Sequence, residues 1–238
     1  EQLSDAVVSY GQAIEIQREL VRAAPAQKCY RHDLAVSFNN LGLTQSKLRQ
    51  VPEAERSFRQ ALELQEILVN QNPYDLDLHS SLGGIYNNLG IVLEELERVA
   101  EAAEAYRKAV EHQQVACSHA PKVSRYRLFL SKHCYNYGRV LRELGRPDEA
   151  ARVALVRRKL WPDDPRRLYT VAEELALAGK LLSESRQTGT TAEECAGYAI
   201  ETLQQAVESG LELPADLYQN EAFAALKDHR QFAELVKK

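Results

Sequence analysis

The chain has 238 residues, and 30 Lys or Arg against 34 Asp or Glu give it a formal net charge of −4. This balance argues against an electrostatic nucleic-acid binder, and the 45% of apolar residues argue against a disordered chain. With 27% charged residues but only 11 Gly and 8 Pro, the composition is typical of a mostly helical protein.

No stretch is apolar over the length that a membrane-spanning helix needs, and the first residues do not resemble a signal peptide. We therefore expect no membrane insertion by this chain. It contains no Met, which suggests a piece of a longer protein.

The sequence offers no enzyme chemistry. Its histidines form no metalloprotease motif, and no nucleophile elbow or phosphate-binding loop is present. The four cysteines lie far apart without zinc-ligand spacing, and we expect them to be reduced, buried thiols: Cys29, Cys117, Cys134 and Cys195. The sequence thus predicts no catalytic residue, no metal site and no cofactor.

A 48-residue repeat organises the chain. One tetrapeptide returns twice at this step, as Asn39-Asn40-Leu41-Gly42, Asn87-Asn88-Leu89-Gly90 and Tyr135-Asn136-Tyr137-Gly138. An aromatic residue follows the same step at Tyr10, Phe58 and Tyr106. Because glycine weakens a helix, its return at a fixed place within a helical stretch predicts close packing against a neighbouring helix.

Within each repeat, the spacing of alanines and aromatics by three and four residues indicates one helix face. We expect an all-α fold, an α-solenoid of antiparallel helix pairs with a capping helix pair at the C-terminus. In chain order the helices are 4–24, 31–50 with 53–70, 76–98 with 100–119, 124–145 with 148–160, 166–182 with 192–209, and short helices at 216–227 and 229–237, with a polar loop at 183–190.

These helices predict a single domain over residues 1–238. Its expected parts are a partnerless second-type (B) helix at 1–25, repeats at 29–71, 74–119 and 122–161, a divergent repeat at 164–209 and a cap at 214–238. The cap should cover the last open face with Leu217, Phe223, Leu226, Phe232 and Leu235. The first helix has no preceding partner, so its exposed stripe should contact the missing part of the parent protein or a second copy.

The repeated pattern of aromatic-Asn-Asn-Leu-Gly, then Pro or an acidic residue, then Glu-Ala with an aromatic four residues later, resembles the tetratricopeptide repeat in a long-unit form. More narrowly, the stretches 30–42, 168–172, 203–207 and 224–232 resemble the repeat arrays that follow the kinase domain of planctomycete-type bacterial serine/threonine protein kinases. This resemblance implies an upstream kinase domain, since no kinase motif occurs in these residues. We expect a cytoplasmic location, although the parent protein could be anchored in a membrane.

The resemblance also implies a concave groove lined by the first helix of each pair, suited to an extended peptide or a partner helix. The positions that it places in the groove are Asn39, Leu43, Asn87, Ile91, Tyr135 and Arg139, and Lys132 and Arg142 lie on the same stripe as the last two. These cations could bind a carboxylate or phosphate group, or they could form a solvated helix face. Asn40, Asn88 and Asn136 either bond neighbouring helices or face the groove.

Three functions remain open. The first is a non-catalytic protein-interaction module, as the regulatory or recruitment region of a kinase. The second is a self-association scaffold that forms homo-oligomers through the first helix. The third is a small-molecule sensor with a pocket inside the array. The sequence does not identify the partner protein or peptide.

Overall fold

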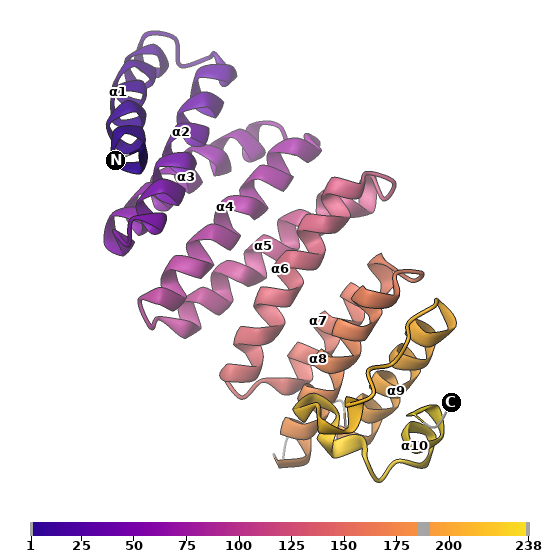
Figure 1. The fold of residues 1–238 in the computed structure, drawn as a ribbon. Helices are drawn as coiled ribbons and strands as arrows, with labels where there is room; N and C mark the ends of the chain where they lie inside the picture. Colours follow the sequence, from indigo (N-terminus) through magenta and orange to yellow (C-terminus); the bar gives the residue numbers. More distant parts are fainter. Residues whose placement is uncertain (1, 185–190, 237–238) are drawn as a thin grey trace. The chain divides into compact units, whose positions relative to one another are not determined.

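The computed structural model describes residues 2–184 and 191–236, and in these ranges the chain forms helices and turns but no strand, which confirms the all-α fold (Figure 1). The elements are α1 (Gln2–Ala23), α2 (Lys28–Lys47), α3 (Val51–Gln71), α4 (Leu76–Glu95), α5 (Val99–His119), α6 (Ser124–Glu143), α7 (Pro147–Leu160), α8 (Pro165–Glu184), α9 (Ala192–Glu208), the 3-10 helices η1 (Leu217–Gln219) and η2 (Glu221–Leu226), and α10 (Arg230–Val236). Within the described ranges, no helix has the length and apolar character needed to cross a membrane.

The chain divides into two compact units, Glu1–His133 and Cys134–Lys238, and α6 contributes to both. In the first unit each helix packs on the next, from α1 through α5. The first helices of successive pairs begin at residues 28, 76 and 124, and the second helices begin at 51, 99 and 147. Each series advances in steps of 48 residues, so the period seen in the sequence is also the spacing of the helices.

Two of the repeated glycines allow a neighbouring aromatic ring to reach the helix backbone. A Cβ atom on Gly42 would lie 2.8 Å from the Phe58 ring, and one on Gly90 would lie 2.6 Å from the Tyr106 ring. Both rings are buried. The predicted close packing is therefore confirmed for these two repeats. In the third, the nearest atoms to a Cβ on Gly138 are 3.8 Å or more away, because Ala154 occupies the place of the aromatic residue.

In the first three pairs, the first helix ends two or three residues earlier than the sequence predicts. The chain turns at Arg49, Glu97 and Gly145, which have φ values of 61°, 60° and 65°. A left-handed residue just after a helix is a common way to end it, and glycine adopts this conformation with the least strain. Because two of the three positions are not glycine, the sequence alone did not indicate these ends.

Buried glutamines connect consecutive pairs in the first unit. The Nε2 atom of Gln65 on α3 donates to the carbonyl oxygen of Leu78 on α4, at 3.0 Å. Likewise, Nε2 of Gln113 on α5 donates to the carbonyl oxygen of Tyr126 on α6, at 3.1 Å. Each bond reaches 13 residues along the chain. Gln17, Gln65 and Gln113 also follow the 48-residue step. This recurrence, which the sequence analysis did not use, is a signal for these bonds.

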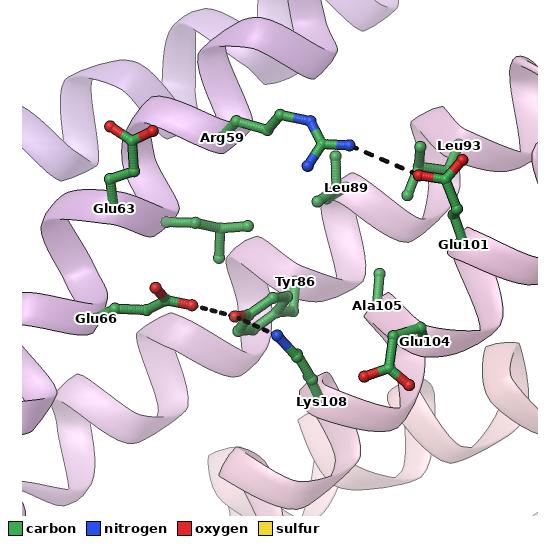
Figure 2. Close-up of a pocket in the computed structure, with 11 residues that line it drawn as sticks. Arg59, Glu63, Glu66, Tyr86, Leu89, Leu93, Glu101, Glu104, Ala105 and Lys108 are labelled. Atoms are coloured by element: carbon green, nitrogen blue, oxygen red, sulfur yellow. Dashed lines mark hydrogen bonds and ion pairs between the residues drawn. The ribbon is translucent and has the colours of Figure 1, made fainter.

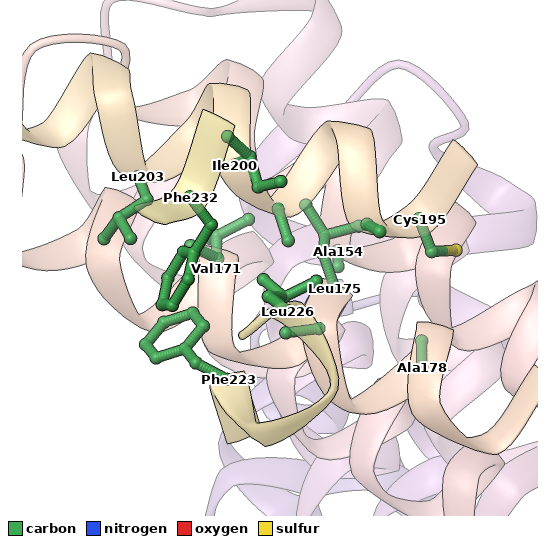
Figure 3. Packing of buried hydrophobic residues seen from close by; sticks show 14 of the residues in the cluster. Ala154, Val171, Leu175, Ala178, Cys195, Ile200, Leu203, Phe223, Leu226 and Phe232 are labelled. Atoms are coloured by element: carbon green, nitrogen blue, oxygen red, sulfur yellow. The ribbon is translucent and has the colours of Figure 1, made fainter. Parts of the chain in front are cut away.

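In the second unit, α8 packs on α7 and α9, and the C-terminal elements cover α8 and α9 (Figure 3). The expected lid residues Leu217, Phe223, Leu226 and Phe232 are all buried in this core, and Leu235 packs at its margin. The prediction of one helix over 216–227 was wrong, because two short 3-10 helices, η1 and η2, form there instead. Asn220 separates them, and its side chain accepts a hydrogen bond from the backbone N–H of Ala222.

Other predictions also need correction or remain untested. Of the predicted polar loop 183–190, residues 183 and 184 belong to α8 and the rest lie outside the described residues. Three cysteines are buried as expected, but Cys29 is exposed near the start of α2. On α1, only Ile14 is buried, whereas Val8, Ile16 and Leu20 are exposed. What covers this face stays a prediction.

Candidate functional site

Two adjoining pockets form a groove in the first unit, between α2 and α4 and beside the start of α6. The larger, of about 470 Å³, is lined by His32, Val36, Asn39, Gln65, Asp77, Ser80, Ser81, Gly84, Ile85, Asn88, Arg125 and Phe129. The smaller, of about 310 Å³, is lined by Lys28, Cys29, His32, Leu68, Asp75, Asp77 and Leu78. Because both include His32 and Asp77, the two pockets meet at these side chains.

An amide pair marks one end of this groove. The Nδ2 atom of Asn88 donates to Oδ1 of Asn39, at 3.0 Å, across α4 and α2. This bond orients both amides and leaves Nδ2 of Asn39 and Oδ1 of Asn88 for other partners. Val36 and Phe129, which are both partly exposed, add apolar surface to the same pocket. The pocket therefore combines a donor and an acceptor with apolar walls.

The carboxylate of Asp77 is held at the junction of the two pockets. Arg125 Nη2 and the Tyr126 hydroxyl both donate to its Oδ1 atom, each at 2.5 Å. Burial and the bond to Asp77 raise the pKa of the Tyr126 hydroxyl, so it stays protonated as a donor at neutral pH. These contacts compensate the charge of Asp77, so the middle of the groove is nearly neutral.

Of the groove residues predicted on α2 and α4, some line the pockets, some are accessible but lie outside them, and one is buried. Asn39 and Asn88 line the larger pocket, and Asn88 also bonds a neighbouring helix, as one of its two interpretations predicted. Leu43 is exposed and Ile91 half-buried, and Asn40 is half-buried, but none of these lines the pockets just described.

Asn87 was expected in the groove, but its side chain is only 1% exposed. Neighbouring residues on a helix point about 100° apart. The rotation that turns Asn88 toward the pocket therefore turns Asn87 into the helix packing. This correction gives the groove position to Asn88.

On α6, Lys132 is exposed at the end of the first unit, while Asn136, Arg139 and Arg142 are half-buried in the second. Tyr135 is 44% exposed, and the guanidinium carbon of Arg157 lies 5.3 Å from the centre of its ring.

Burial shifts the titration of these arginines. It lowers the pKa of Arg142, and it lowers the pKa of Arg157 to about 10. Arg157 is hydrogen-bonded to Glu174, and both side chains are buried. The carboxylate of Glu174 compensates the charge of Arg157, so the positive charge beside the exposed Tyr135 ring comes from Arg142 and the neighbouring Arg139.

A third pocket, of about 350 Å³, lies between α3 and α5 over α4 (Figure 2). Its carboxylates already have partners. Arg59 lies 3.9 Å from Glu101, and Glu66 accepts a hydrogen bond from the Tyr86 hydroxyl, which Lys108 also approaches at 3.3 Å. Burial and the bond to Glu66 raise the pKa of Tyr86. These contacts occupy the charged side chains of this pocket, whereas the amide pair of the α2–α4 groove keeps a donor and an acceptor for a ligand, so the groove is the better candidate.

Family models match two parts of the chain. Both carry the description "tetratricopeptide repeat", and they cover residues 34–75 and 83–113. These segments are tetratricopeptide repeats. Each match includes part of a helix pair that lines the groove. Tetratricopeptide repeats are interaction modules rather than catalytic domains, which agrees with the expectation that this chain is not an enzyme.

One of the solved structures compared with this chain, BtubC (BKLC), has a similar fold. The chain superposes on BtubC (BKLC) from P. vanneervenii with a TM-score of 0.58 and 19% identity, covering 100% of this chain and 89% of that one. PilF of Pseudomonas aeruginosa has a TM-score of 0.47 and 16% identity, covering 98% of this chain and 90% of that one. YrrB, a tetratricopeptide repeat protein with an unusual peptide-binding site, has a TM-score of 0.40 and 17% identity, covering 92% of this chain and 97% of that one. A search of curated proteins finds no match.

Proposed function

We propose that the chain is a protein-interaction module that binds an extended peptide in the groove between α2 and α4. The observation that supports this most is the oriented amide pair Asn39–Asn88 beside apolar side chains. A peptide backbone presents one N–H and one C=O per residue, and the free donor and acceptor of the pair match them. Val36 and Phe129 would contact the side chains of the peptide.

The groove has room for a short segment. From Cys29 in the smaller pocket to Asn39 in the larger one, α2 advances ten residues, or about 15 Å. An extended chain covers this length with about five residues. The neutral middle of the groove, where Asp77 is paired, favours a peptide whose central residues are uncharged.

The test is selection of peptides from a random heptapeptide library, followed by fluorescence anisotropy with the selected sequence. We expect Asn88→Ala to weaken binding about tenfold, the loss expected for one or two hydrogen bonds. Asn40→Ala is the matched control. It removes an amide next to Asn39 in the sequence that does not line the pockets. Equal effects of the two substitutions, or failure to select any peptide, would contradict the proposal.

A second candidate surface is on α6, where Arg142 lies close to Tyr135 and to Arg139. We propose that it binds the carboxylate or phosphate groups of an acidic peptide. Binding of an Asp- and Glu-rich peptide should then weaken with added salt and with Arg142→Gln. Salt-independent binding would contradict an electrostatic site.

At the level of the whole protein, we propose that the repeats are of the 48-residue long-unit form and that the chain is one domain in the cytoplasm. We propose further that it forms the regulatory region of a bacterial serine/threonine kinase, for which the resemblance described above is the support. The test is the sequence that precedes Glu1 in the parent gene, where a kinase catalytic loop is expected.

Self-association is the alternative function that a specific observation favours, since α1 exposes Val8, Ile16 and Leu20. Sedimentation at increasing protein concentration should then show a dimer that Ile16→Glu abolishes. A mass that stays monomeric would exclude it. Small-molecule sensing, the other alternative, would use the same two pockets, and thermal-shift screening without any stabilising compound would count against it.

A further inference from the structure

Two histidines meet between α4 and α5, away from the groove. The Nδ1 atoms of His79 and His112 are 3.2 Å apart, and their ring centres are separated by 5.4 Å. The other ring nitrogen of His79, Nε2, lies 3.0 Å from the carbonyl oxygen of Pro73. A carbonyl only accepts, so Nε2 carries the proton of a neutral His79 and its Nδ1 atom presents a lone pair.

We propose that His79 and His112 together bind a divalent transition-metal ion, such as Zn²⁺, Ni²⁺ or Cu²⁺, through their Nδ1 atoms. Two imidazole nitrogens at about 2.0–2.1 Å from one metal ion, with an angle of about 90–109° between them, are about 2.8–3.4 Å apart. The observed separation falls in this range. The metal ion takes the place of the Nδ1 proton of His112, which moves to Nε2 of the same ring.

The contact between His79 and the Pro73 carbonyl is of a kind that supports metal binding. Metal-binding histidines usually donate their other ring N–H to a carbonyl or carboxylate, which fixes the tautomer and the ring orientation. On the other side, the Tyr86 ring stacks on His112 at 5.9 Å between ring centres and 3° between planes. Both imidazoles are therefore held in place before a metal ion arrives.

The space for the remaining ligands lies on the side of His112. A pocket of about 250 Å³ is lined there by His112, Glu66, Glu111, Asn70 and Lys108, among others, whereas His79 is buried. In residues 2–184 and 191–236 no group of three or more His, Cys, Asp or Glu side chains could hold a metal ion. Water therefore has to complete the coordination of the two imidazoles.

The pair occurs in one repeat and not in its neighbours. One repeat earlier, the same positions hold Arg31 and Leu64, and one repeat later they hold Arg127 and Leu160. Arg31 donates to the carbonyl oxygen of Pro25, at 3.2 Å, as His79 does to that of Pro73. The contact with the proline carbonyl is thus a repeated structural feature. The second imidazole, that of His112, occurs only in the central repeat, since the equivalent position is leucine in the repeats before and after it.

The test is isothermal titration of the whole chain, without a polyhistidine tag, with NiCl₂ and ZnCl₂. We expect one ion per chain and at least tenfold weaker binding after His112→Ala. His119→Ala is the matched control, because His119 is an exposed histidine on the same helix. His79→Gln keeps a donor for the Pro73 carbonyl while removing the ligand, and a thermal melt shows whether it folds.

Copper gives an independent measurement. The electron paramagnetic resonance spectrum of the Cu²⁺ complex should show coupling to two nitrogens in the wild type and to fewer after His112→Ala. The proposal is overturned if the wild type binds no ion, if His112→Ala binds as tightly as the wild type, or if His119→Ala removes the binding.

Discussion

The repeated glycines provide a matched pair of substitutions within one sequence. In Gly90→Ala the new methyl group would lie 2.6–2.8 Å from three atoms of the Tyr106 ring, which is fully buried and cannot swing into solvent. In Gly138→Ala the same methyl group would meet nothing closer than 3.8 Å. Both glycines are interior helix positions, at corresponding places in their repeats.

The expected magnitudes follow from two effects. Replacing glycine by alanine inside a helix stabilises it by about 1 kcal/mol. Inserting a methyl group into a packed core costs about 1–3 kcal/mol, because side chains and backbone have to move. Gly138→Ala should therefore gain about 1 kcal/mol, while Gly90→Ala should be neutral or lose up to about 2 kcal/mol. The propensity effect is common to both, so the difference between the variants measures the contact with the Tyr106 ring.

Urea unfolding followed by far-UV circular dichroism measures the two variants against the wild type. The fluorescence of Trp161, the one tryptophan of the chain, reports on the second unit separately. A third variant combines Gly90→Ala with Tyr106→Leu, which removes the ring. Measured against Tyr106→Leu alone, the alanine should then cost less stability than it does in the wild type. If Gly90→Ala is as stable as Gly138→Ala, the packing interpretation of the repeated glycine is wrong.

Three further outcomes are expected. Glu97→Gly should stabilise the chain by up to about 1 kcal/mol in urea unfolding, because Glu97 has a φ of 60°, and Gly145→Ala should do the reverse. Burial lowers the pKa of His133 to about 3, and neither ring nitrogen has a hydrogen-bond partner in the described part of the chain. Its neutral form is favoured in the folded state, so its contribution is complete above pH 6.5 and is lost as the pH falls toward 3. Between pH 7.5 and 5, unfolding free energies should fall by about 2 kcal/mol less in His133→Leu than in the wild type. Glu174→Gln should lower the free energy of unfolding by about 3–5 kcal/mol, because it leaves the buried Arg157 without its carboxylate. Replacing both Arg157 and Glu174 by leucine should cost less, because no buried charge is then left without a partner. If the double variant is less stable than Glu174→Gln, this reasoning is wrong.

Much of the fold could be predicted from the sequence, because a repeat fixes many positions at once. One period placed the helices of the first three repeats and indicated close packing at Gly42 and Gly90, and the apolar residues after the last repeat indicated the lid. The turns at Arg49 and Glu97 could not be predicted in the same way, since a left-handed residue is expected at glycine and these are not glycine.

The site was harder to predict than the fold. Asn87 and Asn88 are adjacent, and the choice between them depends on the rotation of α4 against its neighbours, which one sequence does not show. His79 and His112 are 33 residues apart on two helices, so no local motif joins them. The sequence indicated which helices would line a groove, but the side chains that meet in it became visible only after packing.

The buried glutamines described above have a consequence for how such a chain can change its length. Gln65 and Gln113 each reach a carbonyl 13 residues further on, at equivalent places in successive repeats. Removing 48 residues between these places would bring Gln65 opposite the carbonyl of Tyr126 and restore the same bond. A duplication of one repeat would create one more copy of it. Gain or loss of a whole repeat therefore leaves no buried amide without its acceptor, whereas an insertion of any other length between a glutamine and its carbonyl would break the bond.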